Sequence, residues 1–422
     1  MKSPLRVTTW VVPLTYALAA IAAGTLFPRI ETHFFHELAS PASVFATIEI
    51  YSSAASGMLA LSGVVFSLAF VMIQFSATAY SPRLVLWIAR DPFMWHAVGV
   101  FTATFLYAVS ALEWVDRDGL GTVPLLSSLV VIALLFASVT MFIGLIQRIT
   151  RLQINRMLTF TGDQGRAAID AIFPPLETPA AAIMPGELDG LTVTQTVVHL
   201  ERPEVVQALD EKTLVRLASA SGAVIEMIAA VGDTVVKLTP LMYIYGARQP
   251  IDEKKLIGTI EMDEERGFKQ DPKYAIRILV DIALKALAAG SDPTTAVQAL
   301  DQIEDLLLRI GLRRLELGKF YDAAGQLRLV VPYATWEDYL RLALDEILYC
   351  GAHSVQVMRR MKALIHDLIS RLPQERHAAL LYWDSRLQSI IARSFLEPEE
   401  KLEASVEDRQ GLGVPRRPWD KL

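Results

Sequence analysis

Residues 56–83 read SGMLALSGVVFSLAFVMIQFSATAYSPR, and the rest of the chain can be understood outward from this stretch. The run up to Tyr80 is apolar and long enough to cross the hydrocarbon core of a bilayer, which takes ~20 residues. Small or polar residues recur in it at steps of three, four or seven, so a helix places them on one face. These residues are Ser56, Ala60, Gly63, Ser67 and Gln74. Such a face either packs closely against another helix or lines a pathway.

Three more segments have the same apolar character, so the sequence predicts a transmembrane domain of residues 1–160 with four spans. The spans are expected at residues 8–27, 56–80, 96–114 and 123–146. Over 422 residues the chain is 52% hydrophobic, and its mean hydropathy of +0.35 is too high for an ordinary soluble protein. The net charge of −6, without a long basic run, makes nucleic acid an unexpected partner.

Basic residues predict the orientation of these spans. With four spans, every basic cluster falls on the same side of the membrane, and that side is the cytoplasm by the positive-inside rule. The clusters contain Lys2, Arg6, Arg83, Arg90, Arg148, Arg151 and Arg156. We therefore expect a multi-pass protein of the bacterial inner membrane with both termini in the cytoplasm. A cleavable signal peptide over residues 1–22 is an alternative for the first span, and it leaves the large domain cytoplasmic.

The polar remainder of the chain divides by composition into four parts. A Pro/Ala-rich linker is expected at 161–189, a small β-domain at 190–265, an α-helical domain at 271–396 and a flexible tail at 397–422. Proline and acidic caps delimit helices in the α-helical domain, with Asp271-Pro272 opening one and Asp292-Pro293 the next. The single cysteine, Cys350, excludes an intrachain disulfide and is predicted to be a buried thiol.

The β-domain contains a short pattern of turns. Ser221-Gly222-Ala223-Val224 is followed by Val231-Gly232-Asp233 and then by Pro240-Leu241. A Gly-x-Val strand, a Gly-Asp turn and a Pro-Leu strand resemble one half of the barrel sandwich of biotinyl and lipoyl carriers. No lysine occupies the turn that would carry biotin or lipoate, so we expect no cofactor.

Three stretches together resemble a known family of bacterial membrane proteins. They are GVVFSLAFVMIQFSATAYSPRL with the following Asp91, the Gly-Asp β-region, and DPKYAIRILVDIALKALAAGSDPTTAVQALD. The chain is similar over nearly its whole length to the predicted membrane proteins catalogued as domain of unknown function 2254. The resemblance implies four spans followed by a cytoplasmic β-then-helical domain, and it implies no particular activity.

No catalytic motif appears, so we expect that the protein is not an enzyme and has no catalytic residues or metal site. None of the seven histidines lies in an HExxH or Cys-His pattern, and no phosphate-binding loop is present. The most polar cluster is a candidate ligand or assembly turn formed by Asp281, Asp292, Thr294 and Thr295. Its members also have structural explanations, because Asp281 can pair with Lys285 and Asp292 can cap a helix.

A channel or passive transport protein is the function that these observations favour. Four helices enclose no wide pore, so copies of the chain would assemble and place the small and polar face, with Phe70, around a shared axis. Gln74 would then form a ring of amides, with Ser81, Pro82 and Arg83 as the cytoplasmic corner. The expected partners are the lipid bilayer, further copies of the chain, and ions or a small solute. The alternative is a membrane-anchored signalling or scaffold protein without transport activity.

Overall fold

The computed structural model describes residues 10–34, 43–79, 92–117, 119, 123–150, 154–176, 190–288 and 292–413. The chain divides into two compact units, Met1–Gln153 and Ile154–Leu422. Each unit buries apolar side chains of its own, so each has a separate core.

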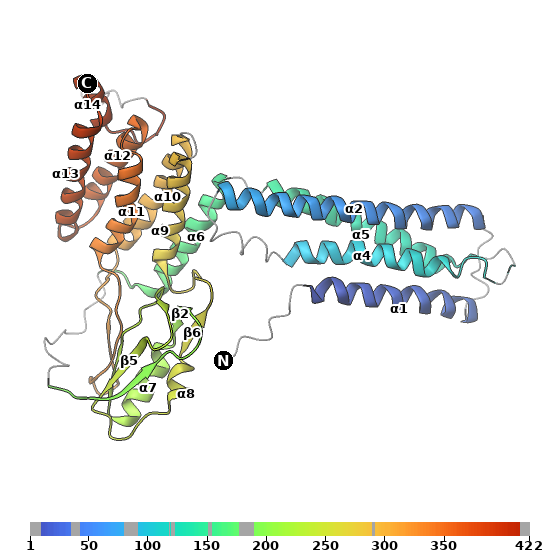
Figure 1. Cartoon of the computed structure of the whole chain (residues 1–422), viewed down its shortest axis with the longest axis horizontal. Coiled ribbons are helices and arrows are strands. Elements are labelled where there is room, and N and C mark those ends of the chain that lie inside the picture. Colours follow the sequence, from blue (N-terminus) through green and yellow to red (C-terminus); the bar gives the residue numbers. More distant parts are fainter. Residues whose placement is uncertain are drawn as a thin grey trace. The chain divides into compact units, whose positions relative to one another are not determined.

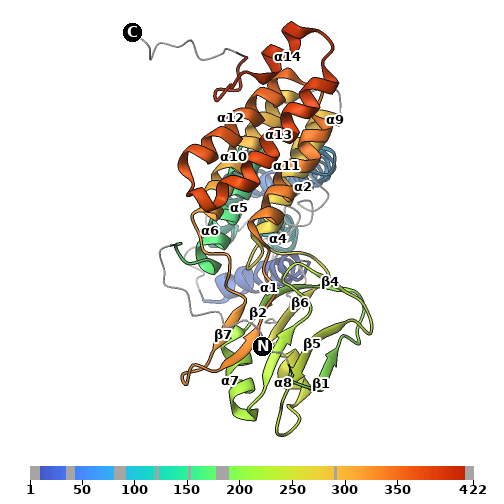
Figure 2. The ribbon, with the colours of Figure 1, turned by 90° about the vertical axis from the view of Figure 1, so that its left-hand side faces the viewer.

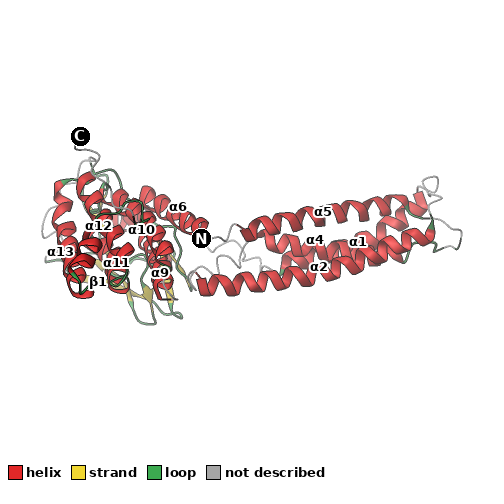
Figure 3. Cartoon of the chain, turned by 90° about the horizontal axis from the view of Figure 1, so that it is seen from above, coloured by secondary structure: helices red, strands yellow, loops and turns green. Residues whose placement is uncertain are grey.

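The first unit is a bundle of four long helices that run side by side (Figures 1 and 3). They are α1 (Val11–Phe34), α2 (Val44–Ala79), α4 (Pro92–Leu112) and α5 (Leu125–Thr150). Each is long and apolar enough to cross a membrane, with candidate spans at Val11–Glu31, Val44–Val71, Pro92–Leu112 and Leu125–Gln147. The predicted four apolar helices are therefore confirmed. The second of them begins earlier than expected, at Val44 instead of Ser56.

Helix α4 is the most enclosed of the four because it packs against the other three. Close approach is achieved through glycine. A Cβ built on Gly24 of α1 would lie 2.8 Å from the Cβ of Ser110 in α4, and one on Gly99 of α4 would lie 2.6 Å from the Tyr16 ring. Small residues at these contacts let the helix backbones pack tightly, as is common between membrane helices.

The second unit contains two β-sheets. The strands are β1 (Val193–Val198), β2 (Glu204–Leu209), β3 (Val224–Met227), β4 (Thr234–Val235), β5 (Pro240–Tyr245), β6 (Ile260–Asp263), β7 (Lys319–Tyr321) and β8 (Leu327–Val330). One sheet has the order β1-β5-β3-β8-β7 and the other β4-β2-β6. All pairings are antiparallel except β3 with β8. Helix α7 (Glu211–Ser221) packs on the larger sheet, and the short α8 (Glu253–Ile257) lies near β1.

Seven helices form the rest of the second unit, and they gather to one side of the sheets (Figure 2). They are α6 (Ile154–Ile172), α9 (Pro272–Ala288), α10 (Pro293–Gly311), α11 (Trp336–Cys350), α12 (Val355–Arg371), α13 (His377–Ser394) and α14 (Pro398–Ser405). A short 3₁₀ turn, η2 (Gln374–Arg376), precedes α13. Helices α9 and α10 are the centre of this group, with α6, α11 and α12 against them.

The structure corrects three expectations about the second unit. Residues 161–172 are part of helix α6 and not of a linker, because their small side chains pack on α9 and α10; a Cβ on Gly165 would lie 2.9 Å from that of Ala275. The region expected to be wholly helical contains the hairpin β7–β8, which completes the larger sheet beside β3. The expected flexible tail contains helix α14 and a buried Asp408.

Two further expectations concern the burial of Cys350 and the strands around Gly232. Cys350 is exposed at the end of α11, so the predicted burial of its thiol is wrong. The strand–turn–strand order expected around Gly232 is present as β3, β4 and β5. Strands β3 and β5 belong to the larger, mixed sheet, and β4 belongs to the smaller one. The similarity to a barrel sandwich stays a prediction.

Candidate functional site

The candidate pore residues all lie on one exposed face of α2. Within a single chain every one of them is exposed, and Phe70 exposes 68% of its surface. The set, called the α2 outer face below, consists of Ser56, Ala60, Gly63, Ser67, Phe70 and Gln74. The described residues of α2 that are buried in the bundle lie on another side of the helix, and they are Thr47, Tyr51, Ala54, Ala55, Met58 and Val65. The α2 outer face therefore points away from its own bundle.

The prediction that Gly63 allows close packing against another helix is not met within the described part of one chain, and it stays a prediction for contacts with another molecule. A Cβ built on Gly63, or on the neighbouring Gly57, would meet no atom within 4 Å, in contrast to the crowded Gly24. Among the described residues, no helix of the same chain lies against Gly63. Lipid or another molecule must therefore cover this position in a membrane.

The C-terminal end of α2 is only partly described. Gln74 is exposed and lies one turn beyond Val71, where the candidate span ends. Ser81, Pro82 and Arg83, the expected cytoplasmic corner, lie outside the described residues.

A buried carboxylate links α1 to α5, and the sequence interpretation missed it. Glu31 is only 4% exposed. Its Oε1 accepts the Leu126 N–H at 2.8 Å, and its Oε2 accepts the Ser127 N–H at 3.1 Å and the Ser127 hydroxyl at 3.3 Å. These are backbone donors of the first turn of α5, which the helix itself leaves unpaired. The apolar run of the first predicted span ends at Phe27, whereas α1 continues to Phe34, so Glu31 lies within the helix.

Hydroxyl pairs continue this polar core between the helices. The Tyr51 hydroxyl of α2 is 3.1 Å from Ser128 Oγ of α5, and Thr104 Oγ1 of α4 is 2.9 Å from Ser138 Oγ. Both serines also donate to the carbonyl four residues earlier, Ser128 to Pro124 and Ser138 to Leu134. Hydroxyls that are paired in this way fix the helices against one another and do not form an open polar channel.

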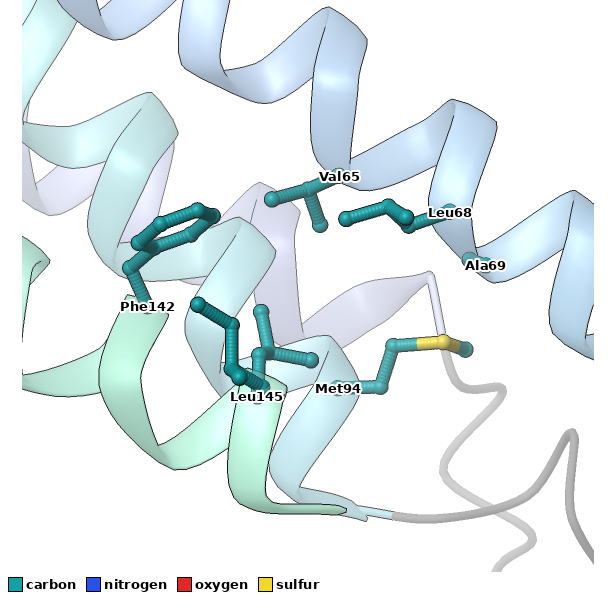
Figure 4. A pocket seen from close by; sticks show the side chains of 7 residues that line it. Val65, Leu68, Ala69, Met94, Phe142 and Leu145 are labelled. Atoms are coloured by element: carbon teal, nitrogen blue, oxygen red, sulfur yellow. The ribbon is translucent and has the colours of Figure 1, made fainter. Parts of the chain in front are cut away.

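One small cavity lies inside the described part of the bundle. A cavity of about 10 Å³ lies between α2, α4 and α5, and its lining is apolar (Figure 4). The side chains around it are Val65, Leu68, Ala69, Met94, Phe142, Leu145 and Ile146. A space of this size is at the limit for a single water molecule, and apolar cavities stay dry. It is not a water-filled passage.

The candidate turn in the second unit is explained by local contacts. Asp292 caps α10, with its Oδ1 accepting the Thr295 N–H at 3.1 Å and its Oδ2 accepting the Thr295 hydroxyl at 2.5 Å. Asp281 accepts a hydrogen bond from Arg277 Nε at 2.7 Å, and Arg277 also pairs with Glu346. Thr294 is exposed. These residues hold helices in place, and nothing in their contacts indicates a ligand.

Clusters suited to a metal were also sought. Within the described ranges, no group of three or more His, Cys, Asp or Glu side chains is placed to hold a metal ion.

Comparison with known proteins connects these features to a family. Residues 6–367 match the family model described as "Predicted membrane protein (DUF2254)". Uncharacterized proteins of Mycobacterium bovis and Mycobacterium tuberculosis are 25% identical to the chain over 319 residues. The match covers 73% of this chain and 61% of each relative, so it spans less than two thirds of their length. No solved structure matches.

Proposed function

The chain belongs to the DUF2254 family of predicted membrane proteins, and from this premise we propose that its copies assemble in the bacterial inner membrane and form a passive path for ions or small solutes between them. The single observation that carries the proposal is the exposure of the α2 outer face. Ser56 and Ser67 would each place a hydroxyl group against lipid if the chain were alone, which costs free energy. A neighbouring copy that covers this face removes the cost.

The position of the path follows from the packing of one bundle. Side chains and hydroxyl pairs fill the interior, and the cavity described above is small and apolar. A path must therefore lie between copies, around an axis toward which each α2 outer face points. Serine hydroxyls and an amide ring from Gln74 would line it, and Phe70 would narrow it.

The second unit has a regulatory or assembly role in this proposal, and catalysis is not part of it. The positive-inside pattern places this unit and both termini in the cytoplasm. A second candidate function is a membrane-anchored scaffold without transport. Gly57 and Gly63 favour it, because open glycines suit close contact between copies whether or not a path lies beside them.

Ion flux into liposomes that contain the purified full-length chain tests the proposal. We expect flux from the wild type and an oligomer in detergent. Ser67→Leu and Gln74→Leu should each lower the flux by about tenfold, which corresponds to ~1.4 kcal/mol added to the permeation barrier. Phe136→Leu is the matched control, because Phe136 of α5 is 75% exposed and lies outside the α2 outer face.

The oligomeric state separates the two candidates. A wild-type oligomer without flux, dissociated by Gly63→Leu, would support the scaffold and overturn the path. A monomer without flux would overturn both. Gly63→Leu should leave the single bundle folded because open space surrounds Gly63, whereas Gly24→Leu should unfold it because Gly24 contacts Ser110 and Tyr107.

A further inference from the structure

Asp271 is a buried acid without a partner. It precedes α9 and is 2% exposed, and neither oxygen of its carboxyl group has a hydrogen-bond partner among the described residues. The side chain lines a cavity of about 20 Å³, which has room for about one water molecule. An ionised carboxylate in such a place is costly, because burial removes its hydration and the nearby backbone N–H groups of Lys273 and Tyr274 offset that loss only in part.

Four segments meet at this carboxyl group. The turn between β3 and β4 contributes Gly232, which has a φ of +92°, and a Cβ at Gly232 would collide with Asp271 Oδ2. The segment after β8 contributes Tyr333, and α11 contributes the buried Tyr339. The end of α6 adds the apolar Ile172 and Phe173. The carboxyl group therefore lies where the sheets of the second unit meet its helices.

The charged groups near Asp271 compensate it only in part. The Lys273 ammonium donates to the Val231 carbonyl at 2.9 Å instead of to the carboxylate. Burial raises the pKa of Asp271, and the positive charges of Lys273 and Arg266 oppose that rise without cancelling it. The Tyr333 hydroxyl is committed to Glu211 at 2.7 Å, and the pKa of Tyr339 is raised by burial and then by Asp271.

We propose that Asp271 is a proton-binding site that holds the Gly232 turn against the start of α9 when it is protonated and releases the turn when it is ionised. The neutral acid fits this small, enclosed cavity. The carboxylate requires water, which enters by opening the turn. A drop in cytoplasmic pH thus tightens the contact between the sheets and the helices of this unit, and a rise loosens it.

The direction of the pH dependence follows from the raised pKa. The stabilisation is fully present below the ordinary pKa of 3.8 and is lost as pH rises toward the folded-state pKa. Between the ordinary pKa of Asp271 and its folded-state pKa, the carboxyl group is protonated when the turn is closed and ionised when the turn is open. The opening constant therefore rises by up to about tenfold per pH unit and then levels off.

Hydrogen exchange of the full-length protein in detergent, followed across pH and corrected for the intrinsic exchange rate, tests this site. The Gly232 amide is the reporter, because it donates to the Val206 carbonyl at 2.8 Å in the closed turn. Its protection factor should fall with rising pH in the wild type. In Asp271→Asn, which stays neutral, it should not change with pH.

Asp233→Asn is the matched control. Asp233 lies in the same turn, is exposed, and accepts the Ala230 N–H at 2.9 Å. This variant should keep the wild-type pH dependence even if its turn is looser at every pH. A pH-independent wild type would overturn the proposal, as would an unchanged slope in Asp271→Asn. If Asp271→Asn does not fold, Asp233→Asn alone can still overturn the proposal. Loss of the pH dependence of the Gly232 protection factor in Asp233→Asn would show that Asp233, and not Asp271, is the titrating group.

Discussion

Glu31 is a side chain whose replacement tests the core of the membrane bundle directly. Its carboxylate accepts three hydrogen bonds from Leu126 and Ser127 at the start of α5. Glu31→Ala leaves two backbone N–H groups unpaired in an apolar interior, and we expect a loss of about 1–3 kcal/mol in stability. Thermal unfolding of the full-length protein in detergent, followed by circular dichroism, measures it as a lower Tm.

Two further variants sharpen this measurement. Glu31→Gln retains one acceptor oxygen, so its Tm should lie between that of Glu31→Ala and that of the wild type. Glu49→Ala is the control, because Glu49 of α2 is exposed and its replacement should lower the stability only slightly. If Glu49→Ala lowers the Tm as much as Glu31→Ala does, the loss comes from the change in charge and not from the contact with α5.

The segment after α14 shows how one buried side chain orders an element. Asp408 accepts the N–H groups of Gln410 at 3.0 Å, Gly411 at 2.9 Å and Gly413 at 2.7 Å. The segment is fixed to α12 because Gln356 donates to the Gly411 carbonyl and Arg359 to that of Gly413. A single carboxylate thus organises a turn that composition alone presents as a polar tail.

Asp408→Ala should release this segment. Three hydrogen bonds to a charged acceptor are lost, and we expect a local cost of about 3 kcal/mol. Limited proteolysis measures it as faster cleavage after residue 405, with cleavage elsewhere in the second unit unchanged. Glu400→Ala, at an exposed position in α14, is the matched control and should be cut at the wild-type rate.

Helices with strong local signals could be predicted from the sequence. The expected helix start at Asp271-Pro272 coincides with that of α9, and Asp292 caps α10 as its Asp-Pro signal indicates. Strands β7 and β8 were not predicted because they have only three and four residues; β7 pairs with β8, and β8 pairs with β3, which is far away in the chain. Non-local pairing of this kind leaves almost no local pattern.

The sequence predicts which residues share the candidate face of α2, but it does not predict what that face contacts. Spacing alone placed Ser56, Gly63 and Ser67 on one face of a helix. Whether that face meets the bundle or lipid depends on neighbours that hydropathy does not identify, because both surroundings are apolar. Asp271 shows the same limit. The Asp271-Pro272 pair correctly predicts the start of a helix. The burial of the Asp271 carboxyl group depends on the Gly232 turn and on α11, which are distant in the sequence.

The orientation of the whole molecule can be tested with its own chemistry. Cys350 is the single cysteine, and its exposure at the end of α11 makes it a reporter for the compartment of the second unit. The basic residues that flank the spans predict that this unit is cytoplasmic. A membrane-impermeant maleimide should therefore leave Cys350 unlabelled in intact cells and label it in inverted membrane vesicles.

A second reporter on the opposite side makes the measurement decisive. In a Cys350→Ser background, Glu113→Cys places a thiol at an exposed position just after α4, in the connection to α5. Four spans with cytoplasmic termini put that connection outside, so this variant should react in intact cells and be protected in sealed inverted vesicles. Labelling of both thiols from the same side would contradict a single membrane span between the two positions, because α5 alone separates them. Labelling of Cys350 in intact cells, with Glu113→Cys protected, would invert the orientation and move the proposed pH-sensitive Asp271 out of the cytoplasm.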